Sequence, residues 1–124
     1  MHVLIKKNHL VLKDYKIKCA VGKRGIGKKK REGDLITPKG IFKIKKVYYR
    51  KDRVKNLITK IKKVAIKKDM GWCDDPKSLK YNKSVKFPFK YKSEKLFRTD
   101  NIYDIIIVLN FNMISYSISE GLKG

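Results

Sequence analysis

The sequence predicts a mainly β domain with at most short helices, and three observations support this prediction. Apolar and polar residues alternate over residues 15–20 with the period of two that a half-buried strand shows. Residues 103–109 open on Tyr103 and continue as an almost unbroken Ile/Val run, which is typical of a strand. Residues 22–40 are rich in Gly and Lys and end in the turn chemistry of Thr37-Pro38-Lys39-Gly40, which predicts a loop between two strands.

The expected elements follow from these patterns along the chain. We expect short strands over residues 3–5 and 10–12, a half-buried strand over 15–20 and another strand over 41–49. The strand over 103–109 is apolar at nearly every position, which predicts burial on both faces and a central place in its sheet. Residues 22–40 and 71–88 are predicted to be loops, and Thr37, Pro38 and Gly40 a turn within the first.

Two further segments have a helical pattern. Residues 93–97 are expected to form one helical turn capped by Ser93. Residues 54–66 fit helical spacing through Val54, Leu57, Ile58, Ile61 and Val64, but their β-branched residues also suit extended chain.

The charge of the chain is extreme, with 33 Lys plus Arg against 11 Asp plus Glu and a net charge of +22. It indicates either an anionic partner or the codon bias of an AT-rich genome, and the excess of Lys over Arg favours the second. In either case we expect salt-sensitive, non-specific binding to polyanions. The 124 residues suffice for one domain with a modest core.

Cysteine and leader patterns exclude several classes of protein. Cys19 and Cys73 are too few for a disulfide framework and lack metal-ligand spacing, and Cys19, on an expected strand, is predicted to be a core residue. No segment is long and apolar enough to span a membrane, and residues 1–12 do not form a secretory signal peptide. Export by another route, a non-native start and a cytoplasmic protein all stay open.

The segment from Gly22 to Lys28 matches the first seven positions of a phosphate-binding P-loop. Lys29 stands where that motif needs Ser or Thr, and Gly33 and Pro38 follow too soon for the required helix. We therefore predict a basic loop here, and interpret the run from Lys28 to Arg31 as a solvated part of it rather than a nucleic-acid patch.

Three motifs follow one another in the chain. They are residues 33–42 (GDLITPKGIF), residues 71–76 (GWCDDP), and Tyr103-Asp104 before the apolar run that ends at residues 109–112 (LNFN). In this order they resemble the L,D-transpeptidase catalytic domain (YkuD-like) over about residues 20–112.

The resemblance implies a sandwich-like β fold, extended chain over residues 54–66, and a bacterial transferase of the cell envelope or periplasm that needs no cofactor. In that family a cysteine in a Ser/Thr-x-Gly-Cys loop, activated by a histidine, attacks a carbonyl of a peptidoglycan stem peptide and expels D-alanine. An acceptor amine then gives a cross-link, whereas water trims the peptide.

The sequence departs from this pattern, because it has no Ser/Thr-x-Gly-Cys and no histidine after His9. We therefore expect residues 1–124 to be a single, C-terminally incomplete domain, marginally stable and inactive as given, with Gly121–Gly124 resembling the tail before the missing histidine strand. Whether the chain is an enzyme stays uncertain.

All candidate site residues except Tyr81 come from the matched motifs, and none is predicted to be catalytic or a metal ligand. Cys73 is not expected to be a nucleophile, because Asp74 and Asp75 disfavour its thiolate and no histidine is at hand. The substrate-cleft candidates are Trp72, Asp74, Asp75, Tyr81, Tyr103 and Asp104.

Each of these candidates also has a structural interpretation. Asp74 and Asp75 more commonly organise a loop, and Trp72 and Tyr81 fit a groove or a core equally well. Asp104 needs a partner, for which Arg98 is the expected residue.

Two other functions stay open from the sequence. One is a small basic module that binds a polyanion or nucleic acid without catalysis. The other is a non-catalytic remnant that binds the cell wall.

Overall fold

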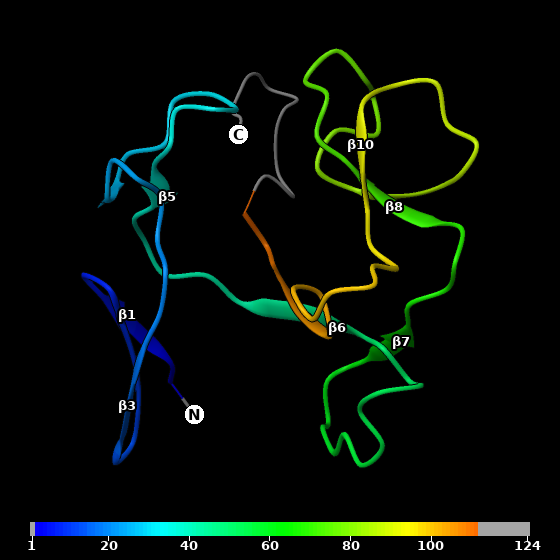
Figure 1. Ribbon diagram of the computed structural model, residues 1–124. Coiled ribbons are helices and arrows are strands. Elements are labelled where there is room, and N and C mark those ends of the chain that lie inside the picture. Colours follow the sequence, from blue (N-terminus) through cyan, green and yellow to red (C-terminus); the bar gives the residue numbers. More distant parts are fainter. Residues whose placement is uncertain (1, 112–124) are drawn as a thin grey trace. The chain divides into compact units, whose positions relative to one another are not determined.

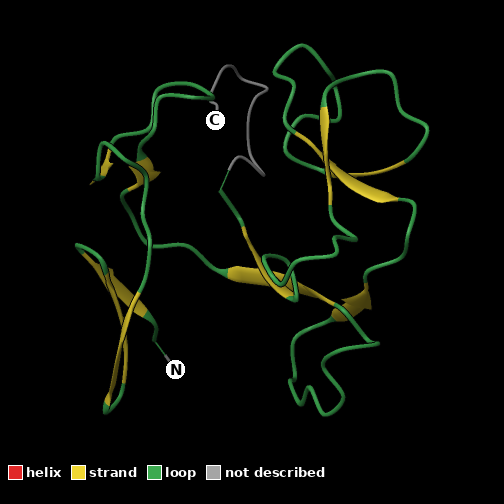
Figure 2. Ribbon diagram, viewed as in Figure 1, coloured by secondary structure: helices red, strands yellow, loops and turns green. Residues whose placement is uncertain are grey.

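The structure, a computed structural model, describes residues 2–111, and these contain strands but no helix (Figures 1 and 2). The prediction of a mainly β chain is confirmed. Residues 112–124, which include Asn112, the Ser-rich end and the expected tail Gly121–Gly124, lie outside the described residues. The chain forms two compact units, Met1–Ile41 and Phe42–Gly124, and each is described by itself.

The first unit begins with an antiparallel three-stranded sheet in the order β1 (Leu4–Lys6), β2 (His9–Leu12) and β3 (Tyr15–Lys18). These strands confirm the early predictions. The half-burial expected for residues 15–20 is wrong, because no element of this unit covers the face that carries Tyr15 and Ile17, which are 68% and 56% exposed. Cys19 follows β3 and is only partly buried.

The segment predicted as a loop over 22–40 contains a short parallel ladder of β4 (Ile26–Gly27) and β5 (Thr37–Pro38). Thr37 and Pro38 therefore lie in a strand rather than in the expected turn, since the amides of Thr37 and Lys39 donate to the carbonyls of Gly25 and Gly27. Gly40 follows with a φ of 146°. No helix follows residues 22–28, as expected once the P-loop was excluded.

In the second unit, β6 (Ile44–Tyr49) is the middle strand of a sheet with β11 (Ile105–Leu109) antiparallel on one side and β7 (Lys63–Ala65) parallel on the other. The strand predicted over 103–109 is confirmed. Residues 54–66 contain no helix, but only residues 63–65 of them form a strand, β7. The central place predicted for the strand over 103–109 is wrong, because β6 takes that place. One face of β11 stays open, with Ile105, Ile107 and Leu109 45%, 54% and 39% exposed.

A second sheet in this unit has β8 (Met70–Cys73) between β9 (Ser84–Lys86) and β10 (Ser93–Lys95), all antiparallel. Two predictions are wrong here: the loop over 71–88 begins within β8 and contains β9, and residues 93–95 of the expected helical turn form β10. The reason is pairing between distant segments, since Ser93 and Glu94 lie opposite Cys73 and Trp72, and such pairing overrides a local capping signal.

The core of the second unit gathers side chains from both of its sheets. Tyr48, Ile66 and Leu96 are buried at its centre. The partly buried residues packed against them are Val64, Met70, Trp72, Phe97, Tyr103, Ile106 and Val108. Two of the cleft candidates, Trp72 and Tyr103, thus contribute to this core.

Candidate functional site

Trp72 lies in the middle of β8, between Ser84 on β9 and Glu94 on β10. Its ring packs edge-on against Tyr48, with centroids 6.1 Å apart and an interplanar angle of 84°. Its indole N–H donates to Oδ1 of Asn82 at 3.0 Å. Since both its apolar ring and its polar atom are engaged within the protein, the structure favours the core interpretation that the sequence left open for Trp72.

Cys73 ends β8 and is the most deeply buried side chain among the described residues, with 0% exposure. Its backbone amide donates to the carbonyl of Lys83, and its own carbonyl accepts from Asn82. Its thiol lies 3.9 Å from the carbonyl oxygen of Asp75. Cys73 is therefore a packing residue of the β8 end, inaccessible to a substrate carbonyl.

Asp75 organises the loop that follows β8. Its Oδ1 accepts from the amide of Lys77 at 3.0 Å and its Oδ2 from the amide of Lys92 at 3.5 Å. Its carbonyl accepts from Ser78 at 3.0 Å. The carboxylate of Asp75 thus has the loop-forming role that aspartate commonly has in turns.

Asp74 differs from its neighbour. Its Oδ2 lies 4.0 Å from the ammonium of Lys92, and its side chain is 31% exposed. Its Oδ1 is buried and has no hydrogen-bond partner among the described residues. A buried carboxylate oxygen without a donor is costly, so Oδ1 is the atom of this loop most in need of an added N–H donor.

Tyr81 and Tyr103 have different settings. Tyr81 is half-buried in the loop before β9, and its amide donates to the carbonyl of Ser78.

The hydroxyl of Tyr103 donates to Oε1 of Glu94 in a short hydrogen bond. Burial, reinforced by this hydrogen bond, raises the pKa of Tyr103 to about 12. Tyr103 thus stays protonated and joins the segment before β11 to β10.

Asp104 is held by Arg53 and Asn101, not by Arg98 as expected. Its Oδ1 accepts from Arg53 at 2.9 Å and its Oδ2 from Asn101 at 2.8 Å. These two hydrogen bonds lower the pKa of Asp104, Asn101 having the larger effect. Arg98 turns instead to Asp100, whose Oδ2 lies 2.6 Å from its Nη2.

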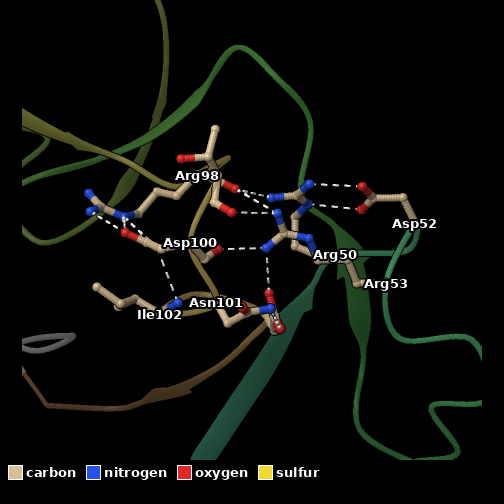
Figure 3. Close-up of polar contacts among 9 residues, drawn as sticks. Arg50, Asp52, Arg53, Arg98, Asp100, Asn101 and Ile102 are labelled. Carbon is tan, nitrogen blue, oxygen red and sulfur yellow. Dashed lines mark hydrogen bonds and ion pairs between the residues drawn. The ribbon is translucent and has the colours of Figure 1, made fainter.

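Arg50, Arg53 and Arg98 form an arginine cluster with their partners, which no motif in the sequence predicts (Figure 3). Arg50 is only 4% exposed and donates two hydrogen bonds, of 2.9 and 2.8 Å, to the carboxylate of Asp52. Arg50 and Arg53 both donate to the carbonyl of Arg98. Arg53 also donates to the carbonyls of Thr99 and Asp100. The two guanidinium groups thereby fix the loop that leads from β10 to β11.

A signal for this cluster was present in the sequence. The chain has only five arginines, Arg24, Arg31, Arg50, Arg53 and Arg98, among its 33 basic residues. In a chain that uses lysine for most of its basic residues, an arginine indicates a position where a planar donor of several hydrogen bonds is needed. Three of the five lie in the cluster.

The cleft candidates contribute to two parts of the second unit, which the hydrogen bond from Trp72 to Asn82 joins. Trp72, Tyr103 and Asp104 support the core and the arginine cluster, whereas Asp74, Asp75 and Tyr81 belong to the loop between β8 and β9. Within residues 2–111 no three His, Cys, Asp or Glu side chains are grouped as metal ligands would be. The same residues include no helix able to cross a membrane.

The family model of the L,D-transpeptidase catalytic domain (YkuD) matches residues 1–107, which begins earlier in the chain than the motifs alone suggested. No curated protein matches the chain, and no solved structure matches it.

Proposed function

Because the chain belongs to the L,D-transpeptidase catalytic domain family, we propose that it binds peptidoglycan stem peptides at the cell envelope and that residues 1–124 do not themselves carry out acyl transfer. The observation that carries the binding role is the family match over residues 1–107. Family membership implies an L,D-transpeptidase-like function and peptidoglycan peptides as its partners.

The chemistry of the two cysteines supports the absence of acyl transfer. A cysteine nucleophile needs an accessible thiolate and a base that takes up its proton. Cys73 is fully buried beside two aspartates, and the sequence has no histidine after His9. Cys19 follows the edge of a sheet in the first unit and is not part of a Ser/Thr-x-Gly-Cys loop.

For peptide binding, the loop after β8 is the best-supported contact. Oδ1 of Asp74 is desolvated and has no donor among residues 2–111, while Asp75 holds the loop in place. The side chain of Asp74 is 31% exposed, and an amide or amine N–H of a stem peptide would bind the exposed part of this carboxylate. Asp74 is therefore the residue we assign to peptide contact, and Asp75 is its positioning residue.

The test is co-sedimentation of the purified chain with insoluble peptidoglycan in about 1 M salt, where charges are screened beyond about 3 Å. The proposal predicts that binding persists and falls several-fold in Asp74→Ala. Asp14→Ala, which changes an exposed carboxylate in the turn after β2, is the matched control and should bind normally. Binding that disappears in high salt would instead assign the interaction to the net charge and overturn the proposal.

A further inference from the structure

A depression on the second unit is lined by Lys51, Lys55 and Lys68, which we call its border, by the apolar residues Ala65, Ile66 and Phe97, which we call its floor, and by Asp52. Its volume is about 630 Å³, within the usual range of small-ligand sites. We propose that it binds a multivalent phosphate anion, a role separate from stem-peptide binding.

The charges of the depression favour an anion. Lys51, Lys55 and Lys68 are exposed, and within residues 2–111 none of them makes a hydrogen bond or an ion pair. Asp52 does not cancel them, because both of its oxygens are engaged by the guanidinium of Arg50, at 2.9 and 2.8 Å. Three lysines that line one hollow are therefore without a partner among the described residues.

The floor of the depression is held in place before any ligand arrives. Ile66 is buried in the core, and Phe97 packs against that core. The guanidinium of Arg50 lies 3.6 Å from the centroid of the Phe97 ring and is tied to Asp52 and to the carbonyl of Arg98. An apolar floor keeps water from one side of a bound anion, which strengthens its attraction to the lysines.

A second lysine-lined depression shows why the first is preferred. It has a volume of about 460 Å³ and is bordered by Lys67, Lys80 and Lys86. There Lys86 lies 3.5 Å from Asp69 and is already paired. The first depression is both larger and free of such pairing.

The three lysines favour a ligand that carries several linked phosphate groups. Lysine binds phosphate as a point charge, and a single contact at an exposed site contributes little. A ligand with several phosphate groups engages several ammonium groups at once. We therefore expect tripolyphosphate to bind at least about tenfold more tightly than orthophosphate, the excess reflecting this multivalency. Equal affinity for the two would overturn the proposal.

The decisive experiment compares two triple variants by titration calorimetry with tripolyphosphate. Lys51→Gln/Lys55→Gln/Lys68→Gln removes the border, and Lys13→Gln/Lys16→Gln/Lys18→Gln removes three exposed lysines of the first unit. Each lowers the net charge of +22 by three, to +19, so their overall electrostatic fields are alike. We expect about a tenfold loss of affinity in the first variant and less than about twofold in the second. An equal loss in both would show that only net charge attracts the anion.

A second readout needs no variant. Acetylation of the wild-type lysines, quantified by mass spectrometry, should slow selectively at Lys51, Lys55 and Lys68 when tripolyphosphate is present. Protection spread evenly over all exposed lysines would contradict the site.

Discussion

The guanidinium of Arg50 stacks on the ring of Phe97, 3.6 Å from its centroid. Arg50 directly follows the middle strand β6, and Phe97 follows β10 of the other sheet. The stack therefore joins the two sheets of the second unit next to their shared core. Because Arg50 also holds Asp52 and the carbonyl of Arg98, one side chain fixes three segments of this unit.

Arg50→Lys is expected to lower the melting temperature by about 5 °C or more, although it keeps the charge. Lysine cannot form the two-pronged contact with Asp52 or stack flat on Phe97. Thermal unfolding followed by circular dichroism measures the change. Lys51→Gln, at the next and exposed position, is the control and should melt like the wild type; equal melting of both variants would contradict the role of Arg50.

Gly22→Ala is expected to destabilise the first unit by about 1–3 kcal/mol, the cost of overpacking. An added Cβ would lie 2.8 Å from the carbonyl carbon of Leu35 and 2.9 Å from the amide nitrogen of Thr37. Both are backbone atoms that cannot turn aside. Gly27→Ala is the matched control, since its Cβ would come no closer than 3.8 Å to Ile36. Denaturant unfolding compares them, and similar stabilities would refute the close approach.

Acid is expected to weaken the arginine cluster. Hydrogen bonds from Asn101 and Arg53 lower the pKa of Asp104. The hydrogen bonds from Arg50 lower the pKa of Asp52 to about 2. A carboxyl whose pKa is lower in the folded state than in the unfolded state stabilises the fold. This stabilisation is complete above the unfolded pKa of about 4 and is lost as the pH falls through the folded pKa. The melting temperature should therefore drop between about pH 4 and pH 2.

Asp104→Asn isolates one contribution to that drop. The difference in melting temperature between wild type and this variant should be largest above about pH 4 and shrink toward pH 2. Asp14→Asn, at an exposed turn, is the matched control and should change the melting temperature little. A difference for Asp104→Asn that stays constant across this range would rule out the ion pair as its cause.

The two thiols should react at different rates with an alkylating reagent. Cys19 is partly exposed, whereas Cys73 is fully buried. Under native conditions we expect one rapid modification, at Cys19, and two after unfolding. In Cys19→Ala the native protein should react slowly; rapid modification of Cys73 in that variant would show an accessible thiol.

Local patterns in the sequence predicted those strands whose signal lies within the strand itself. The alternation around Ile17 and the Ile/Val run from Ile105 both gave strands in the structure. Their burial could not be predicted in the same way, because it depends on which face another element covers. Ile107 is 54% exposed although it lies in the most apolar run of the described chain.

Pairing between distant residues explains the errors. Ser93 has the pattern of a helix cap, but it pairs with Cys73, twenty residues earlier, in a sheet. The sequence predicts Arg98, which is near in the chain, as the partner of Asp104, but Asp104 forms its ion pair with Arg53, far earlier in the chain. No local pattern marked Arg50 or Arg53; only the scarcity of arginine pointed to them.

The chain belongs to the L,D-transpeptidase catalytic domain family, and our proposal is that these 124 residues do not themselves carry out acyl transfer. The most direct test is the intact mass of the chain after incubation with a carbapenem, which acylates the nucleophilic cysteine in this family. We expect the mass to stay unchanged, because Cys73 is buried and no histidine follows His9. A stoichiometric adduct, mapped to Cys73 or Cys19, would contradict the account and show that the chain forms the acyl-enzyme by itself.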